Sequence, residues 1–146
     1  MLRKLTLTAA VLVAGPVFAD GHAATGDAAE GEKAFRQCQS CHVVQNDAGE
    51  VLAGRAAKTG PNLYGIVGAV YGAREDFNGY SDIIMAANAQ GLTHGTEADF
   101  VAYVMDPTAH LQEITGESGR SKMTYKVRKE EDAINLYAFL AQFSAE

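Results

Sequence analysis

The chain has two cysteines, Cys38 and Cys41, and they stand in the stretch CQSCH with His42 directly after the second. Three kinds of site use cysteines at this spacing: a redox disulfide, a zinc site and the attachment point of a c-type haem. In a haem site, each thiol forms a thioether to one vinyl group of a single porphyrin, and the adjacent histidine ligates the iron. The pattern therefore limits the chain to a small set of architectures.

The rest of the sequence favours haem over the two rivals. A Cys-x-x-Cys redox motif normally follows a strand in a βαβ unit, and no strand pattern precedes Cys38. Zinc would need further ligands nearby, and the sequence has no second cysteine pair and no histidine pair. We therefore predict one covalent haem c, held by Cys38 and Cys41, with His42 as an iron ligand. A thiol–disulfide protein without haem is a weaker alternative.

The N-terminus has the pattern of a cleaved export signal, since Arg3 and Lys4 precede an apolar run and small residues follow near Ala19. We expect a signal peptide over residues 1–19, a flexible tail over residues 20–26 and one domain over residues 27–146. The apolar run is about half of the roughly 20 residues that a spanning helix needs. The sequence thus predicts a periplasmic protein with no stable membrane anchor.

Charge argues against nucleic acid as a partner. The formal net charge is −6, and it becomes −8 once Arg3 and Lys4 are removed with the signal. The stretch RSKMTYKVRK, residues 120–129, holds five of the ten basic residues that remain and no acidic residue. This stretch is either a solvated loop or a positive docking patch.

The helical patterns are short and separated by loops. Asp27 is placed to cap a first helix, with Glu30 able to reach back from its third position. Ser81 opens a second helix that ends near Gly91, and Thr96 with Asp99 opens a third. The third helix ends at Asp106-Pro107, and a last one runs from about Glu130 to Phe143.

Loops take up the remainder. Residues 43–80 contain eight glycines and prolines and no long alternating strand pattern, and residues 108–129 are expected as a long polar loop. The predicted fold class is all-α, with about four short helices and long loops wrapped around one covalent haem. Aliphatic residues alone make a thin core for so much loop, so a cofactor should fill the centre.

A second iron ligand would make the protein an electron carrier, whereas an open position would make a haem enzyme or gas sensor. Met85 and Met105 lie on predicted helices, where core filling is the simpler role. His110 is the best imidazole candidate, and Met123 stands out in the polar basic stretch SKMTYK. The candidates are His22, His94, His110, Met85, Met105 and Met123.

Taken together, these segments resemble class I cytochromes c, most closely bacterial cytochrome c2 and related periplasmic carriers. GDAAEGEKAFRQCQSCH resembles the N-terminal helix and haem site of that family, and KTGPNLYGIVG resembles its proximal loop. SKMTYK is similar to the loop that carries an axial methionine, and LYAFL to the C-terminal helix that crosses the first near Gly31 and Phe35.

The resemblance implies roles for individual residues. Met123 becomes the sixth ligand with Ser121 as its hydrogen-bond partner, and the carbonyl of Pro61 orients His42. Further expected haem contacts are Tyr80 at a propionate, Tyr103 beside the haem near the methionine sulfur, and His94, which stands where the family often has a propionate-binding tryptophan.

The resemblance also implies a monomeric single-electron carrier that is not an enzyme. It would take electrons from a cytochrome bc-type complex and pass them to a reaction centre, an oxidase or a reductase. A c-type haem enzyme or gas sensor with an open site is the alternative. The residues expected to dock on acidic partners are Lys33, Arg36, Lys58, Lys122, Lys126, Arg128 and Lys129.

Overall fold

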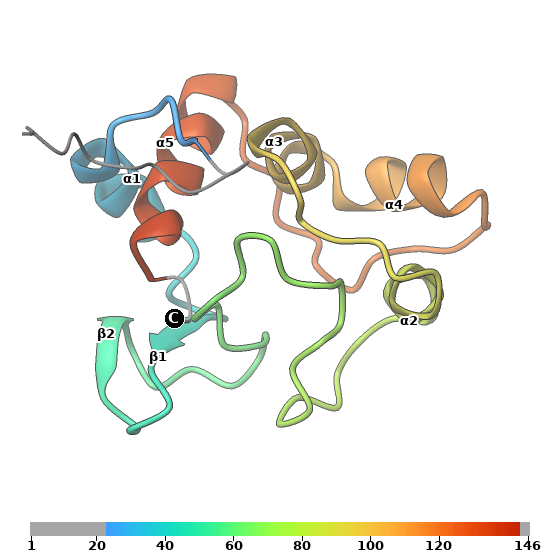
Figure 1. Ribbon diagram of the computed structural model, residues 1–146, viewed down its shortest axis with the longest axis horizontal. Helices are drawn as coiled ribbons and strands as arrows, with labels where there is room; N and C mark the ends of the chain where they lie inside the picture. Colours follow the sequence, from blue (N-terminus) through green and yellow to red (C-terminus); the bar gives the residue numbers. More distant parts are fainter. Residues whose placement is uncertain (1–22, 144–146) are drawn as a thin grey trace, which may run out of the picture.

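The computed structural model describes residues 23–143. Helices dominate this part of the chain, and loops of residues 55–80 run beneath them (Figure 1). The elements are α1 (Ala28–Phe35), β1 (Val43–Gln45), β2 (Val51–Gly54), α2 (Asp82–Ala89), α3 (Glu97–Met105), α4 (Pro107–Thr115), α5 (Glu130–Leu140) and the 3-10 turn η1 (Ala141–Phe143).

The first and last helices cross at a glycine, as expected. A Cβ atom on Gly31 would overlap the backbone carbonyl of Asn135 on α5, so the absence of a side chain permits the close approach seen in Figure 1. Phe35 and Phe139 pack beside the crossing with ring centroids 5.3 Å apart. This crossing places the end of α1, and hence the cysteine pair, against the core.

Helix starts follow the predicted caps with one difference. The Asp27 carboxylate accepts from the N–H groups of Ala29 and Glu30, and Thr96 Oγ1 accepts from Asp99 N–H at 3.1 Å. Glu30 does not reach back to the cap, because its carboxylate pairs with Lys33 Nζ at 2.6 Å.

The prediction of a loop over residues 108–129 is wrong for the first third of that segment, because Pro107–Thr115 forms α4. Asp106 ends α3 and also caps α4, since its carboxylate accepts from Ala109 N–H at 3.2 Å. Proline is favoured in the first turn of a helix, so Asp106-Pro107 is a start signal as well as a stop signal. Gly116 then ends α4 with a φ of +71°.

The sequence did not predict the two short strands of this fold. Strands β1 and β2 pair antiparallel, with Val43 opposite Gly54 and Val44 opposite Ala53. Val44 is fully buried, whereas Val51 and Leu52 are exposed. Each strand is only three or four residues long, too short for an alternating pattern to stand out.

Contacts with the helices begin slightly before Asp27. Thr25 Oγ1 donates to the Glu97 carboxylate on α3 at 2.6 Å, and its N–H donates to the same carboxylate at 2.8 Å. This end of the segment expected as a flexible tail is therefore fastened to the helices. The expected signal peptide and residues 20–22 lie outside the described residues.

Candidate haem-binding site

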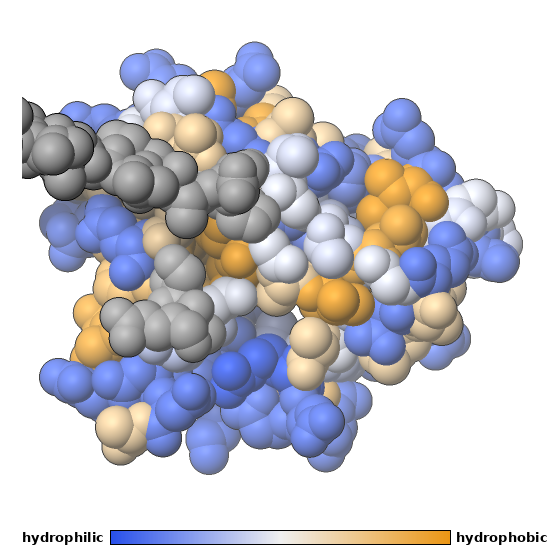
Figure 2. Space-filling view, in the orientation of Figure 1, coloured by the Kyte–Doolittle hydropathy of each residue, from blue (hydrophilic) through white to orange (hydrophobic). Residues whose placement is uncertain are grey.

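A cavity of about 600 Å³ lies between the helices and the loops. Its volume falls in the ordinary range for cofactor sites, roughly 300–1,000 Å³. Apolar side chains such as Leu63, Ile66 and Leu136 make up much of its wall. Figure 2 shows the surface hollowed near the centre of the face drawn, with hydrophobic residues beside the hollow and hydrophilic residues below it.

The cysteine pair opens onto this cavity from the turn that follows α1. Cys38 and Cys41 both line it, and the turn is closed by the His42 N–H, which donates to the Cys38 carbonyl at 2.9 Å. The two thiols are not joined to each other. Burial, together with neighbouring Cys41, raises the pKa of the Cys38 thiol to about 11.

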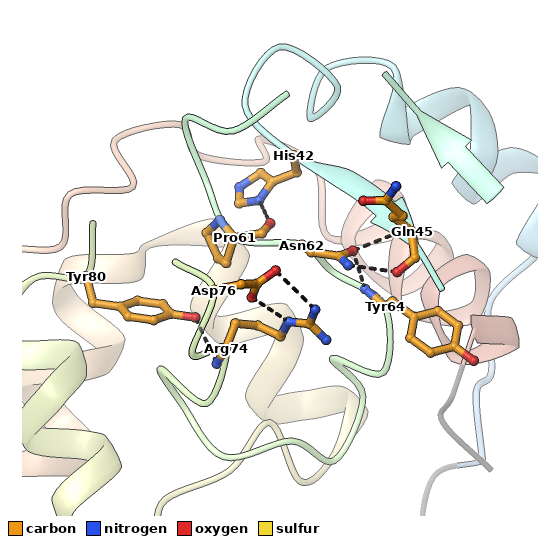
Figure 3. Close-up of polar contacts among 8 residues, drawn as sticks. All are labelled: His42, Gln45, Pro61, Asn62, Tyr64, Arg74, Asp76 and Tyr80. Carbon is orange, nitrogen blue, oxygen red and sulfur yellow. Dashed lines mark hydrogen bonds and ion pairs between the residues drawn. The ribbon is translucent and has the colours of Figure 1, made fainter. Parts of the chain in front are cut away.

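His42 lines the same cavity with a fixed orientation. Its Nδ1 lies 2.8 Å from the Pro61 carbonyl oxygen (Figure 3). A carbonyl only accepts, so Nδ1 carries the hydrogen and Nε2 of the neutral ring has a free lone pair. Burial lowers the pKa of His42 although this hydrogen bond raises it, which keeps the ring neutral. Gly60 packs on the ring, and a Cβ there would overlap it.

Met123 is half-buried and lines the cavity as well. Its N–H donates to Ser121 Oγ at 3.1 Å, and the Ser121 N–H donates to Thr108 Oγ1 on α4 at 3.1 Å. The Ser121 hydroxyl thus bonds to the backbone of Met123. Lys122 Nζ donates to the Tyr80 carbonyl at 3.0 Å, which joins this loop to the opposite wall.

The Met123 loop is also tied to the end of α3. The Val127 N–H donates to the Val104 carbonyl at 2.9 Å, and Lys126 Nζ lies 2.6 Å from Asp106 Oδ2. These contacts hold the loop between α4 and α5, residues 116–129, in place along the cavity.

The cavity wall also contains polar residues. Tyr80 lines it, and its hydroxyl accepts from the Arg74 N–H at 3.2 Å (Figure 3). Ser81 and His94 are wall residues too, but Ser81 Oγ and His94 Nδ1 are buried behind the wall without a hydrogen-bond partner among the described residues. The residues present fit a haem, because two thiols and a histidine with a free Nε2 lie on one largely apolar cavity.

Ser81 and Arg74 were not among the sequence-predicted site residues. Ser81 was singled out as a helix cap, but its side chain makes no capping hydrogen bond to α2. Its position directly after Tyr80 was the available signal. Arg74 also lines the cavity and pairs with Asp76 at 3.2 Å (Figure 3).

The remaining candidate ligands lie elsewhere. His110 does not line the cavity, and its Nε2 is 3.1 Å from the Tyr71 hydroxyl. Met85 is 44 % exposed, so the prediction that it fills the core is wrong. Met105 packs at the edge of the core, and His22 lies outside the described residues. Tyr103, by contrast, is buried at the cavity wall.

All seven predicted docking residues are exposed. Lys122 also lines the cavity, as do Thr124 and Tyr125 of the same loop. Lys33 and Lys126 are engaged in ion pairs with Glu30 and Asp106. Among residues 23–143, no helix has the length and apolar character needed to cross a membrane.

Several known proteins are similar to this chain over most of its length. Cytochrome c2 of Cereibacter sphaeroides is 52 % identical over 118 residues, which cover 80 % of this chain and 94 % of that protein. Cytochrome c2 of Rhodovulum adriaticum is 55 % identical over 118 residues, covering 80 % and 92 %. The X-ray structure of cytochrome c2 from Rhodobacter sphaeroides matches with a TM-score of 0.79 and 50 % identity, covering 83 % of this chain and 98 % of that one. No family model matches the chain.

The helices, the cavity and the cysteine pair define a small haem protein that transfers electrons. The chain belongs to the cytochrome c2 family of class I c-type cytochromes. It carries one covalent haem c attached through Cys38 and Cys41, and it is an electron carrier rather than an enzyme. The predicted fold class is confirmed apart from α4 and the small sheet.

Proposed function

We propose that His42 and Met123 are the two axial ligands of the haem iron. The observation that carries this proposal is that both side chains line one cavity with the two cysteines, while the Pro61 carbonyl holds His42 with Nε2 free. A thioether raises the reduction potential relative to a second imidazole. Neither ligand changes protonation at neutral pH, so the site needs little rearrangement when its charge changes.

The haem supplies the chemistry, because its iron cycles between the ferrous and ferric states and so moves one electron at a time. The protein orients the group and excludes water from it. Pro61 fixes the His42 ring, and the Ser121 hydroxyl holds the backbone of Met123. Tyr80 and His94 would contact the propionates, and Tyr103 would pack beside the ring.

We further propose that the exposed haem edge docks on acidic partners. Five of the seven docking residues carry no ion pair with a carboxylate among the described residues, so their charge is available for steering. A cytochrome bc-type complex is the proposed donor, and a reaction centre, an oxidase or a reductase is the acceptor. The predicted signal peptide supports a periplasmic location. Such contacts are small, fast and salt-sensitive.

Carbon monoxide binding tests the proposed ligation against an open site. With Met123 on the iron, we expect slow binding of carbon monoxide to the ferrous protein at neutral pH, and rapid binding in Met123→Ala. Met85→Ala is the matched control, because Met85 is exposed and does not line the cavity, and it should behave like the parent protein. Rapid binding by the unmodified protein would favour the open-site enzyme or gas sensor.

Docking is tested by the rate of electron transfer with an acidic redox partner as the salt concentration rises. We expect the rate to fall, because screening shortens the reach of exposed charges to about 8 Å at physiological ionic strength. Lys129→Glu should lower the rate at low salt more than Lys33→Glu does, since Lys33 is already paired. Equal effects of the two changes would contradict a docking face centred on the Met123 loop.

A further inference from the structure

A cluster of titratable side chains extends from the cavity wall to α4. Tyr71 and His94 line the cavity, and their ring centroids are 3.9 Å apart. The Tyr71 hydroxyl oxygen lies 3.1 Å from Nε2 of His110, which is on α4. Tyr71 is 1 % exposed and His110 is 7 % exposed. None of the roles described above uses the pair formed by Tyr71 and His110.

We propose that His110, hydrogen-bonded to Tyr71, is a proton-binding site coupled to the haem. His110 binds a proton when the haem is reduced and releases it when the haem is oxidised. In balanced form, the ferric protein with neutral His110 takes one electron from its redox partner and one proton from water. The product is the ferrous protein with a His110 imidazolium. The inference rests on the haem that occupies the cavity.

The change in haem charge on reduction couples the haem to the protonation of His110. A ferric haem carries one more positive charge than a ferrous haem, so it disfavours a nearby imidazolium. Tyr71 is a residue of the cavity wall and its hydroxyl is hydrogen-bonded to His110, so one residue lies between His110 and the cavity. Interactions along such a buried path are screened much less than interactions between exposed charges.

The Tyr71 hydroxyl suits both protonation states of His110. It donates to Nε2 when the imidazole is neutral, and it accepts from Nε2–H when the ring is protonated. The hydrogen bond therefore survives proton uptake, and only the direction of the hydroxyl changes. A phenylalanine at this position would leave a buried imidazolium without this partner, which is costly.

His94 lies closer to the cavity but is a poor proton acceptor. Burial, with a smaller contribution from nearby His110, lowers the pKa of His94 to about 3, so it stays neutral. Burial also lowers the pKa of His110, but Asp99 and Glu113 oppose that shift. The titratable groups that interact with His110 are Tyr71 on the cavity wall, Asp99 and Tyr103 on α3, Glu113 on α4 itself, and His94. Helix α2, which also packs on α4, has one ionisable residue, Asp82.

The proton affinity of His110 in the two redox states tests the proposal directly. We expect its imidazole NMR signals to titrate at a lower pH in the ferric protein than in the ferrous protein. A difference of about half a pH unit, roughly a threefold change in affinity, is the expected size. Identical titration in both states would overturn the proposal. This measurement uses the unmodified protein, so it does not depend on whether a variant folds.

The reduction potential gives a second test. It should fall as the pH rises between the two His110 pKa values and stay level outside that range. His110→Gln retains a hydrogen-bonding group near Tyr71 but cannot titrate, so its profile should lack this step. A step that persists in His110→Gln would contradict the proposal. Haem absorption bands are checked first, because their absence from the parent protein would overturn the haem site itself.

Discussion

Lys126 Nζ lies 2.6 Å from Asp106 Oδ2, so the loop that carries Met123 is joined to the junction of α3 and α4. Oδ1 of the same carboxylate caps α4 through Ala109 N–H. Together with the Val127–Val104 hydrogen bond, this ion pair holds the Met123 loop against the end of α3. The position of Met123 thus depends on residues that lie far from the cysteine pair in sequence.

Asp106→Asn should destabilise the protein in a pH-dependent way. Hydrogen bonds from Lys126 first, and then from Ala109, hold the pKa of Asp106 below its usual 3.8. Because the pKa of Asp106 is lower in the folded protein than in the unfolded chain, the charged carboxylate stabilises the fold above about pH 3.8. This contribution is lost as the pH falls through the pKa of Asp106 in the folded protein. Asparagine still caps a helix, so the variant isolates the charge.

The check on Asp106 is the difference in Tm between the parent protein and Asp106→Asn. It should be largest near neutral pH and shrink at pH values below the folded pKa. Salt should reduce it as well, because the pair is exposed. A difference that stays constant with pH would show that the ion pair does not act through the charge of Asp106.

Lys122→Leu should weaken the attachment of Met123 to the iron. The change removes the donor to the Tyr80 carbonyl without adding a new ligand, and one exposed hydrogen bond contributes about 0.5 kcal/mol, or roughly a twofold effect. When the pH of the ferric protein is raised, the weak far-red absorption band of thioether ligation should then be lost at a lower pH than in the parent protein. Lys129→Leu is the control, because no hydrogen bond or ion pair of its side chain is present in residues 23–143.

Gly60→Ala should disturb His42 in particular. A Cβ at Gly60 would overlap the imidazole ring, and overpacking of this kind costs about 1–3 kcal/mol. The reduction potential should change together with the free energy of unfolding, because the ring would turn away from the Pro61 carbonyl.

Gly91→Ala is the control for Gly60→Ala. Its Cβ meets nothing within 4 Å, and its cost comes from a φ of +68°. We expect a lower free energy of unfolding but an unchanged reduction potential and spectrum. If both variants change the potential equally, the contact between Gly60 and His42 has no special role.

Helix caps and the family resemblance could be recognised from the sequence, whereas features that depend on tertiary contacts could not. Caps such as Asp27 and Thr96 were readable because a helix start is set by neighbours in sequence. Helix α4 was missed because Asp106-Pro107 is consistent with both an end and a start. The strands β1 and β2 are too short to show a period.

Side-chain roles that depend on distant partners were the hardest to predict. Met85 has an apolar neighbourhood in sequence, yet it lies on the outer face of α2. His110 was a candidate iron ligand until its contact with Tyr71, 39 residues earlier, was known. Ser81 was noticed as a cap, although it makes no capping hydrogen bond and is a residue of the cavity wall. None of these three side-chain environments leaves a pattern in the sequence.

The absorption spectrum of the ferric protein, compared with that of Met123→Ala, tests the central claim most directly. Ligation by His42 and Met123 predicts the weak far-red band of a thioether–iron bond in the parent protein and its loss in the variant. The bands of covalent haem should remain in both, because Cys38 and Cys41 are unchanged. Covalent haem without a far-red band in the parent protein, or a band that persists in Met123→Ala, would contradict the account.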